Sequence, residues 1–220
     1  MGERGTKPQG KVAIKWSPNF AYAIGLITTD GNLSSDGRHV SFVSKDKEQI
    51  SNFIKCLRLT NNIGGHNSGN INPAFRVQFG DVLFYNFLLL IGLTPHKSKT
   101  LHSITVPDEY FFDFLRGHFD GDGTFYSYWD PRWKSSFMFY TEFLSASKIH
   151  IQWLQAKLQS FLGIHGHTTK SVNDSTYHLK YAKADSLKLL PKLYYDKGIV
   201  CLSRKRRKIE KTLKVIGKEL

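Results

Sequence analysis

Two stretches of recurring apolar residues along the chain begin and end in similar ways. The first covers 18–30, follows Ser17 and has proline at its first position; the second covers 108–122, follows Pro107 and begins with two acids. These are typical start signals of helices. A glycine follows each stretch, and glycine suits the left-handed position just past a helix end. The pattern predicts two apolar helices with matching ends.

The segments that follow the two predicted helices repeat in the same order. "RHVSFVSKDKEQISNFIKCLRL" (38–59) aligns with "FYTEFLSASKIHIQWLQAKLQSFL" (139–162), which puts Ser44 opposite Ser145. "FRVQF" and "YHLKY" come next, and their alternation of apolar and polar residues predicts strands with one wet face. An apolar helix follows each strand, so each half reads helix, two strands, helix, one or two strands, helix.

This plan predicts an α+β fold of two similar halves. We place an N-terminal extension at 1–16, the first half at 17–104 and the second at 105–220. Gly25 and Gly117 belong to stripes of small residues at four-residue spacing, which would let the two helices pack side by side. Asp30 and Asp122 would then meet at one end, where an acid opposes the negative end of the helix dipole.

Charge adds a partner class to this picture. The 220 residues are 40% hydrophobic, and 31 Lys and Arg outnumber 18 Asp and Glu for a formal net charge of +13. Nucleic acid is the natural anionic partner, although proteins that bind membrane surfaces or other polyanions share this balance. The longest apolar run, 87–93, falls short of the roughly 20 residues of a membrane span. We therefore expect a soluble intracellular protein located with its DNA, in a compartment that the sequence leaves open.

The two helix ends carry a family resemblance. "AIGLITTDG" (23–31) and "LRGHFDGDG" (115–123) resemble the motif of LAGLIDADG homing endonucleases, in the monomeric single-chain form with two motifs. The resemblance implies two pseudo-symmetric αββαββα half-domains with Gly25 and Gly117 at the packed interface. It also implies antiparallel sheets that form a saddle for double-stranded DNA. One departure is that the first acid of the motif is Thr28 in copy one and Asp120 in copy two.

The resemblance also implies a metal site. Asp30 and Asp122 would bind Mg²⁺ over the scissile phosphates, helped by the backbone carbonyls of Thr29 and Gly121. Mn²⁺ would substitute, and Ca²⁺ would bind without cleavage. A dication makes the placement of an acid at a helix end favourable, because it also attracts the carbonyl dipoles.

Family members often add a lysine near each site. The candidates are Lys97 or Lys99 in "TPHKSKTL" and Lys205 in "CLSRKRRKIEK". We favour Lys99 and Lys205 as catalytic residues together with the two aspartates. The alternative for both runs is a solvated basic face that touches backbone phosphate.

Polar residues on the outer faces of the predicted strands are candidates for base reading, since Arg bonds guanine and Gln bonds adenine in bidentate fashion. The candidates are Arg38, Ser44, Arg76, Gln78, Tyr128, Arg132, Lys134, His178 and Lys180. The leading hypothesis, which the resemblance implies, is a sequence-specific DNA endonuclease that makes double-strand breaks at a long target site for intron homing. The alternatives are an RNA maturase or a DNA-binding protein on the same fold that does not cleave.

Overall fold

The computed structural model describes residues 10–66, 74–133, 135–172 and 175–220. Its first half contains α1 (Pro18–Asp30), β1 (Gly31–Leu33), β2 (His39–Ser44), α2 (Lys47–Leu57), β3 (Gly64–His66), β4 (Ala74–Gly80) and α3 (Val82–Leu90). Its second half opens with a 3₁₀ turn, Asp108–Tyr110, and contains α4 (Phe111–Gly121), β5 (Thr124–Trp129), β6 (Phe137–Ser145), α5 (Lys148–Leu162), β7 (His167–Lys170), β8 (Tyr177–Tyr181), α6 (Lys183–Leu193) and α7 (Ser203–Val215).

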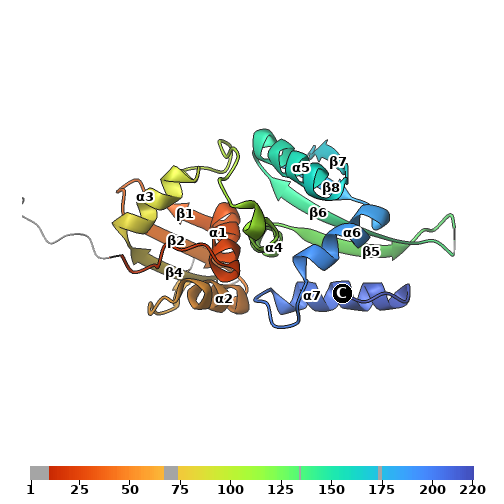
Figure 1. The fold of residues 1–220 in the computed structure, drawn as a ribbon, viewed down its shortest axis with the longest axis horizontal. Coiled ribbons are helices and arrows are strands. Elements are labelled where there is room, and N and C mark those ends of the chain that lie inside the picture. Colours follow the sequence, from red (N-terminus) through yellow and green to blue (C-terminus); the bar gives the residue numbers. More distant parts are fainter. Residues whose placement is uncertain (1–9, 67–73, 134, 173–174) are drawn as a thin grey trace, which may run out of the picture.

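The two halves have the same sheet topology, which confirms the predicted α+β class. Each half builds one four-stranded antiparallel sheet, with strand orders β1-β2-β4-β3 and β5-β6-β8-β7. In Figure 1, α1 and α4 lie together at the centre with one sheet to either side. The helix α7 extends the second half and has no equivalent among the described residues of the first. No helix in the described part of the chain is long and apolar enough to cross a membrane.

The crossing of α1 and α4 leaves no room for a side chain at its centre. A Cβ atom on Gly25 would lie 2.1 Å from the carbonyl oxygen of Phe114, and one on Gly117 would lie 2.0 Å from that of Tyr22. Every residue of α1 from Phe20 to Thr28 is buried. The small residues predicted for this interface therefore lie where the two backbones touch.

The glycines that follow the two helices act differently from the prediction. Gly31 has an extended backbone, with φ −81° and ψ 148°, and Gly123 does not have a positive φ either. What requires glycine is space, because a Cβ on Gly31 would come within 2.6 Å of the Ile27 Cα, and one on Gly123 within 2.7 Å of the Phe119 Cα. The helix ends were predicted at the correct glycines, but the reason given for them, a left-handed backbone conformation, was wrong.

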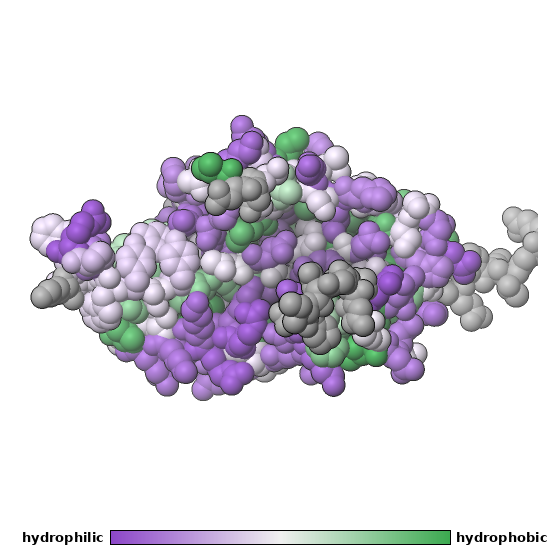
Figure 2. Space-filling model, turned by 180° about the vertical axis from the view of Figure 1, so that it is seen from behind, coloured by the Kyte–Doolittle hydropathy of each residue, from purple (hydrophilic) through white to green (hydrophobic). Residues whose placement is uncertain are grey.

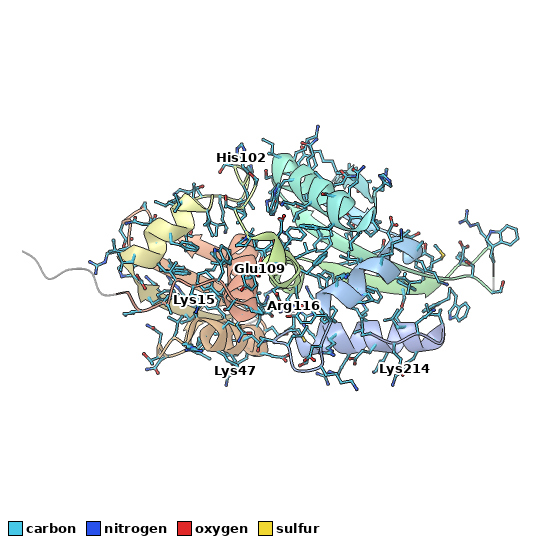
Figure 3. The ribbon with its side chains drawn as sticks, in the orientation of Figure 1. Lys15, Lys47, His102, Glu109, Arg116 and Lys214 are labelled. Atoms are coloured by element: carbon cyan, nitrogen blue, oxygen red, sulfur yellow. The ribbon has the colours of Figure 1, made fainter. Side chains whose placement is uncertain are left out.

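A buried arginine attaches the second half's helices to α4. Arg116 is fully buried and donates to the carbonyls of Val200 (2.9 Å) and Leu193 (3.2 Å), and to the carboxylate of Asp113 (2.8 Å). Figure 3 labels Arg116 on α4, beside α6 and α7. This side chain fixes the segment that leads into α7 against the central helix.

Substitution of Gly25 by alanine tests the crossing. Alanine normally favours a helix over glycine by about 1 kcal/mol. Here, however, its methyl group would clash with the backbone of α4, which cannot rotate aside as a side chain can. We expect Gly25→Ala to lower the free energy of unfolding by about 3 kcal/mol, measured by urea denaturation. Gly65→Ala is the matched control, because nothing lies within 4 Å of a Cβ at that position. Equal stability of the two variants would contradict a close helix contact.

Candidate active site

The two predicted carboxylates meet at the ends of the central helices. Asp30 is the last residue of α1 and Asp122 follows the last residue of α4. A Cβ on Gly121 would lie 2.0 Å from Thr29 Oγ1 and 3.0 Å from Asp30 Oδ2, so one helix end rests against the other. The structure thus brings together all four residues that the sequence proposed for a metal site.

Both acids resist ionisation in this position. Burial and then the charge of Asp122 raise the pKa of Asp30 from 3.8 to about 7, against lowering contributions from Thr29, Lys97 and Lys205. Asp122 is more exposed than Asp30, yet partial burial raises its pKa as well, against the charges of the two lysines. Two carboxylates held in this way would be stabilised in their charged forms by a bound cation.

Two buried lysines hold the carbonyl ends of the helices. Lys205 Nζ donates to the carbonyls of Phe119 (2.5 Å), Asp120 (3.0 Å), Gly121 (3.3 Å) and Gly123 (2.6 Å). The part of α7 that carries Lys205 therefore lies beside the end of α4. The ammonium neutralises part of the negative potential of that helix end.

Lys97, and not Lys99, is the counterpart of Lys205. Lys97 Nζ donates to the carbonyl of Gly31, the position that corresponds to Gly123, and its side chain is 6% exposed. Lys99 is exposed. The structure therefore places Lys97, rather than the favoured Lys99, beside Thr29 and Asp122, and which of the two lysines is catalytic stays a prediction. Two lysines that are two residues apart in an irregular turn have no periodicity that chooses between them.

Burial changes the proton affinity of both lysines. It lowers the pKa of Lys97 from 10.5 to about 8 and that of Lys205 likewise to about 8, although nearby aspartates act in the opposite direction. Each ammonium can therefore release or take up a proton within about one pH unit of neutrality.

Two recesses open on either side of the helix ends. One is lined by residues that include Asp30 and Gly121, and the other by residues that include Thr29, Lys97 and Asp122. Each recess thus combines a carboxylate from one helix with residue 29 or 121 of the other. No cluster of three or more His, Cys, Asp or Glu suited to a metal occurs among the described residues.

The donor set in these recesses fits a hard dication. Carboxylate and carbonyl oxygens are the ligands that Mg²⁺ takes, and Mg²⁺ usually keeps several waters or substrate phosphate oxygens in its remaining positions. Asp30 and Asp122 with the carbonyls of Thr29 and Gly121 would supply the protein's share.

The sheets place most of the predicted DNA contacts on one face. Arg76 and Gln78 pair with Val43 and Ser41 across β4 and β2, on the face opposite the core residues Val40, Phe42, Val77 and Phe79. In the second sheet, Tyr128, His178 and Lys180 share the corresponding face. Figure 2 shows the side of the molecule opposite to that in Figure 1, where hydrophilic side chains cover much of the surface.

Ser44 is not on this face. It pairs with Phe75 in register and shares the core side with Val40 and Phe42, where its hydroxyl donates to Gln49 Oε1 at 2.6 Å and accepts from the Asp46 amide at 3.1 Å. The prediction placed Ser44 and Arg76 on one outer face, which the register of β2 and β4 does not allow.

The remaining predicted contacts lie outside the strands. Arg38 is exposed just before β2, and Arg132 is exposed in the turn between β5 and β6, where it pairs with Asp130 at 3.1 Å. Lys134 lies outside the described residues.

Sequence reasoning also missed several outer-face residues of the second sheet. Tyr126 and Tyr140 lie beside Tyr128, and Glu142 lies 2.9 Å from His178 Nδ1 and 3.5 Å from Lys180 Nζ. The period-two alternation in "TFYSYW" was the signal that could have found Tyr126 together with Tyr128.

Comparison with solved structures decides the fold. The homing endonuclease I-WcaI bound to its DNA recognition sequence aligns over 90% of this chain and 88% of its own, with a TM-score of 0.61 and 15% identity. The chain has the LAGLIDADG fold. I-LtrWI, a LAGLIDADG homing endonuclease bound to target DNA, aligns over 90% of this chain and 89% of its own, with a TM-score of 0.60 and 11% identity.

The LAGLIDADG fold also occurs in DUF199/WhiA, whose description does not call it an endonuclease. Full-length DUF199/WhiA from Thermatoga maritima aligns over 94% of this chain with a TM-score of 0.57 and 16% identity, and the match spans 64% of that protein. No family model and no curated protein matches the sequence. At these identities the similarity establishes the fold, and the chemistry must be argued from the residues.

The raised pKa of Asp30 predicts how stability depends on pH without metal. The folded state binds this proton more tightly than the unfolded chain does, so the stabilisation is complete below pH 4 and is lost as the pH rises to about 7. Asp30→Asn should reduce this loss of stability with rising pH. The free energy of unfolding is measured by urea denaturation at several pH values in EDTA.

Asp130→Asn is the control for this measurement. Hydrogen bonds from Arg132, whose guanidinium stays charged throughout this range, lower the pKa of the Asp130 carboxyl below its usual range, so Asp130 is already ionised between pH 4 and 7. An unchanged slope in Asp30→Asn would show that the Asp30 carboxyl is not held as the structure has it.

Proposed function

We propose that the protein is a sequence-specific DNA endonuclease that makes double-strand breaks with Mg²⁺ at the carboxylate pair. The observation that carries this proposal is the meeting of Asp30 and Asp122 at two helix carbonyl ends, between the buried Lys97 and Lys205. A protein that only binds a polyanion gains nothing from holding two acids there. When bound, the metal would activate water and stabilise the developing charge on the phosphate and the leaving oxygen.

The chain's own residues would form two separate metal-binding sites. In each recess, one aspartate would hold the metal, and the carbonyl of Thr29 or Gly121 from the other helix would complete the protein's share. Lys97 and Lys205 would supply fixed positive charge near the reacting phosphates. Because burial lowers the pKa of both lysines to about 8, either could also pass a proton near neutral pH.

Double-stranded DNA is the substrate that the rest of the surface supports. The chain carries a net charge of +13. Arg76 and Gln78 lie on the outer face of β4, where Arg76 donates to Gln78 Oε1, and on exchanging this bond for base edges they would read guanine and adenine. The neighbours I-WcaI and I-LtrWI were solved with DNA bound. A saddle of two sheets would cover a long target site, and a single chain would supply both halves.

An RNA maturase and a non-cleaving DNA-binding protein are the competing functions. Sequence-specific RNA recognition commonly stacks unpaired bases on free aromatic faces. In the second sheet, however, Tyr140 stacks on Tyr126 and Tyr128 at centroid distances of 5.3 and 6.2 Å, and Lys180 Nζ lies 5.7 Å from the Tyr126 ring. Tyr128 at the end of this row is nevertheless 41% exposed, so the aromatic row alone does not distinguish duplex DNA from unpaired RNA, and the binding measurement below does.

Replacement of either aspartate tests the enzyme. A cleaved site is first selected from a random DNA library with Mg²⁺, with Mn²⁺ as the expected substitute and Ca²⁺ as the expected non-cleaving ion. Asp30→Asn or Asp122→Asn should then lower double-strand cleavage by at least about a hundredfold, because each removes a metal-binding carboxylate. Binding to the same duplex in Ca²⁺ should persist at moderate salt, with Asp36→Asn as control.

Two results would sink this assignment. Undiminished cleavage by both aspartate variants would remove the metal site, and wild-type binding to duplex without cleavage in either Mg²⁺ or Mn²⁺ would leave a DNA-binding protein. Tighter binding to a structured RNA than to duplex would favour the maturase.

The two neighbouring lysines offer a matched comparison. Lys97→Met keeps the length of the buried stem but removes the ammonium next to the helix end, and should lower the cleavage rate about tenfold or more. Lys99→Met removes an exposed charge from the same turn and should leave the rate within about twofold. Single-turnover rates on the selected site distinguish them, and the reverse order would restore Lys99 as the site residue.

A further inference from the structure

A third acid is buried directly behind the carboxylate pair. Asp120 on α4 is completely inaccessible to solvent. Its Oδ2 accepts hydrogen bonds from the Tyr22 hydroxyl (2.8 Å) on α1 and from the Leu202 amide (2.7 Å) at the start of α7. Its Oδ1 is buried without a hydrogen-bond partner. Burial of a carboxylate with incomplete hydrogen bonding costs several kcal/mol, so a purely structural connection could be made more favourably.

The contacts of Asp120 lead directly to Lys205. Leu202 is the N-cap residue of α7, and its carbonyl accepts from the Lys205 amide at 3.0 Å. The Lys205 ammonium returns to α4, where it bonds the carbonyls of Asp120 itself and of Gly121. Asp120 therefore fixes the backbone from which Lys205 extends, and its own carbonyl accepts from the buried ammonium.

The first half lacks this arrangement. Thr28 stands at the position equivalent to Asp120, and its hydroxyl only donates to the Ile24 carbonyl of its own helix at 2.8 Å. Ile24 itself corresponds to Arg116, which in the second half bonds the Val200 carbonyl in the same segment that leads to α7. The second half thus has a polar pair on its central helix where the first has an apolar residue and a threonine.

We propose that Asp120 is a positioning residue for Lys205 and that it makes the two cleavage sites unequal. This inference rests on the proposed endonuclease function only for its effect on cleavage. Its structural part, that the Asp120 carboxylate keeps the Lys205 ammonium at the end of α4, holds or fails independently of whether the protein cuts DNA.

The structural part is tested by the chemical accessibility of Lys205. The metal-free full-length protein is treated with a limiting amount of an amine-acylating reagent, and the modified lysines are quantified by mass spectrometry. Lys205, 9% exposed, should react slowly relative to the exposed Lys99. Asp120→Asn should raise the ratio of Lys205 to Lys99 labelling at least about fivefold, while Thr28→Val, the matched change in the first half, should leave it unchanged.

The catalytic part is tested by the rates at which the two DNA strands are cut. Each strand of the selected duplex carries its own label, and binding in Ca²⁺ confirms that the variants are folded. Asp120→Asn should slow the cutting of one strand about tenfold and leave the other within about twofold. A loss of folded protein would instead slow both strands equally.

A double-mutant cycle decides whether the effect passes through Lys205. If it does, Asp120→Asn should cause no further decrease in the rate of strand cutting when Lys205 is already replaced by methionine. Additive effects, equal slowing of both strands, or unchanged Lys205 labelling would overturn the proposal. Should Asp120→Asn not fold, Tyr22→Phe removes one of the two bonds to the carboxylate and should raise Lys205 labelling by a smaller factor; no increase would overturn it as well. If the wild type does not cleave, the endonuclease function fails, and the labelling result still decides the structural part.

Discussion

The rest of the structure depends on the close contact between α1 and α4. Backbone meets backbone at Gly25 and Gly117, with space for hydrogen atoms and nothing larger. This contact aligns the two helices so that their carbonyl ends finish side by side. Two features of the site depend on this alignment: the raised pKa of Asp30, which comes first from burial and then from the charge of Asp122, and the placement of two buried lysines against the carbonyl ends.

The protein offsets this potential only in part. Lys205 covers four carbonyls of α4, and Lys97 bonds Gly31 at the end of α1. Both ammonium groups bond to backbone carbonyls rather than directly to Asp30 or Asp122, and the pKa of each carboxyl stays raised. The lysines thus stabilise the helix ends without pairing with the two carboxylates, and the proposed dication would supply the missing positive charge.

Sequence was sufficient for the features that repeat. The two helix ends, the order of helices and strands along the chain and the meeting of Asp30 with Asp122 all follow from two copies of one pattern, in which each copy supports the interpretation of the other. It was insufficient where a choice rested on tertiary geometry. Lys97 and Lys99 lie in a turn without periodicity, and the face of Ser44 depends on how β2 pairs with β4. Gly31 and Gly123 were placed correctly for a conformational reason, whereas close packing is what requires them.

The differences between the halves carry more information than their likeness. A symmetric pair of sites needs only the shared parts: two glycines, two aspartates and two lysines. The second half adds Arg116 and Asp120, both buried, and both bonded to the segment that precedes α7. The first half reaches an equivalent lysine position from a short turn after α3, without any such bonds from Ile24 or Thr28. Lys205 projects from α7, a helix that has no equivalent among the described residues of the first half, and the extra polar pair bonds the segment that holds this helix against α4.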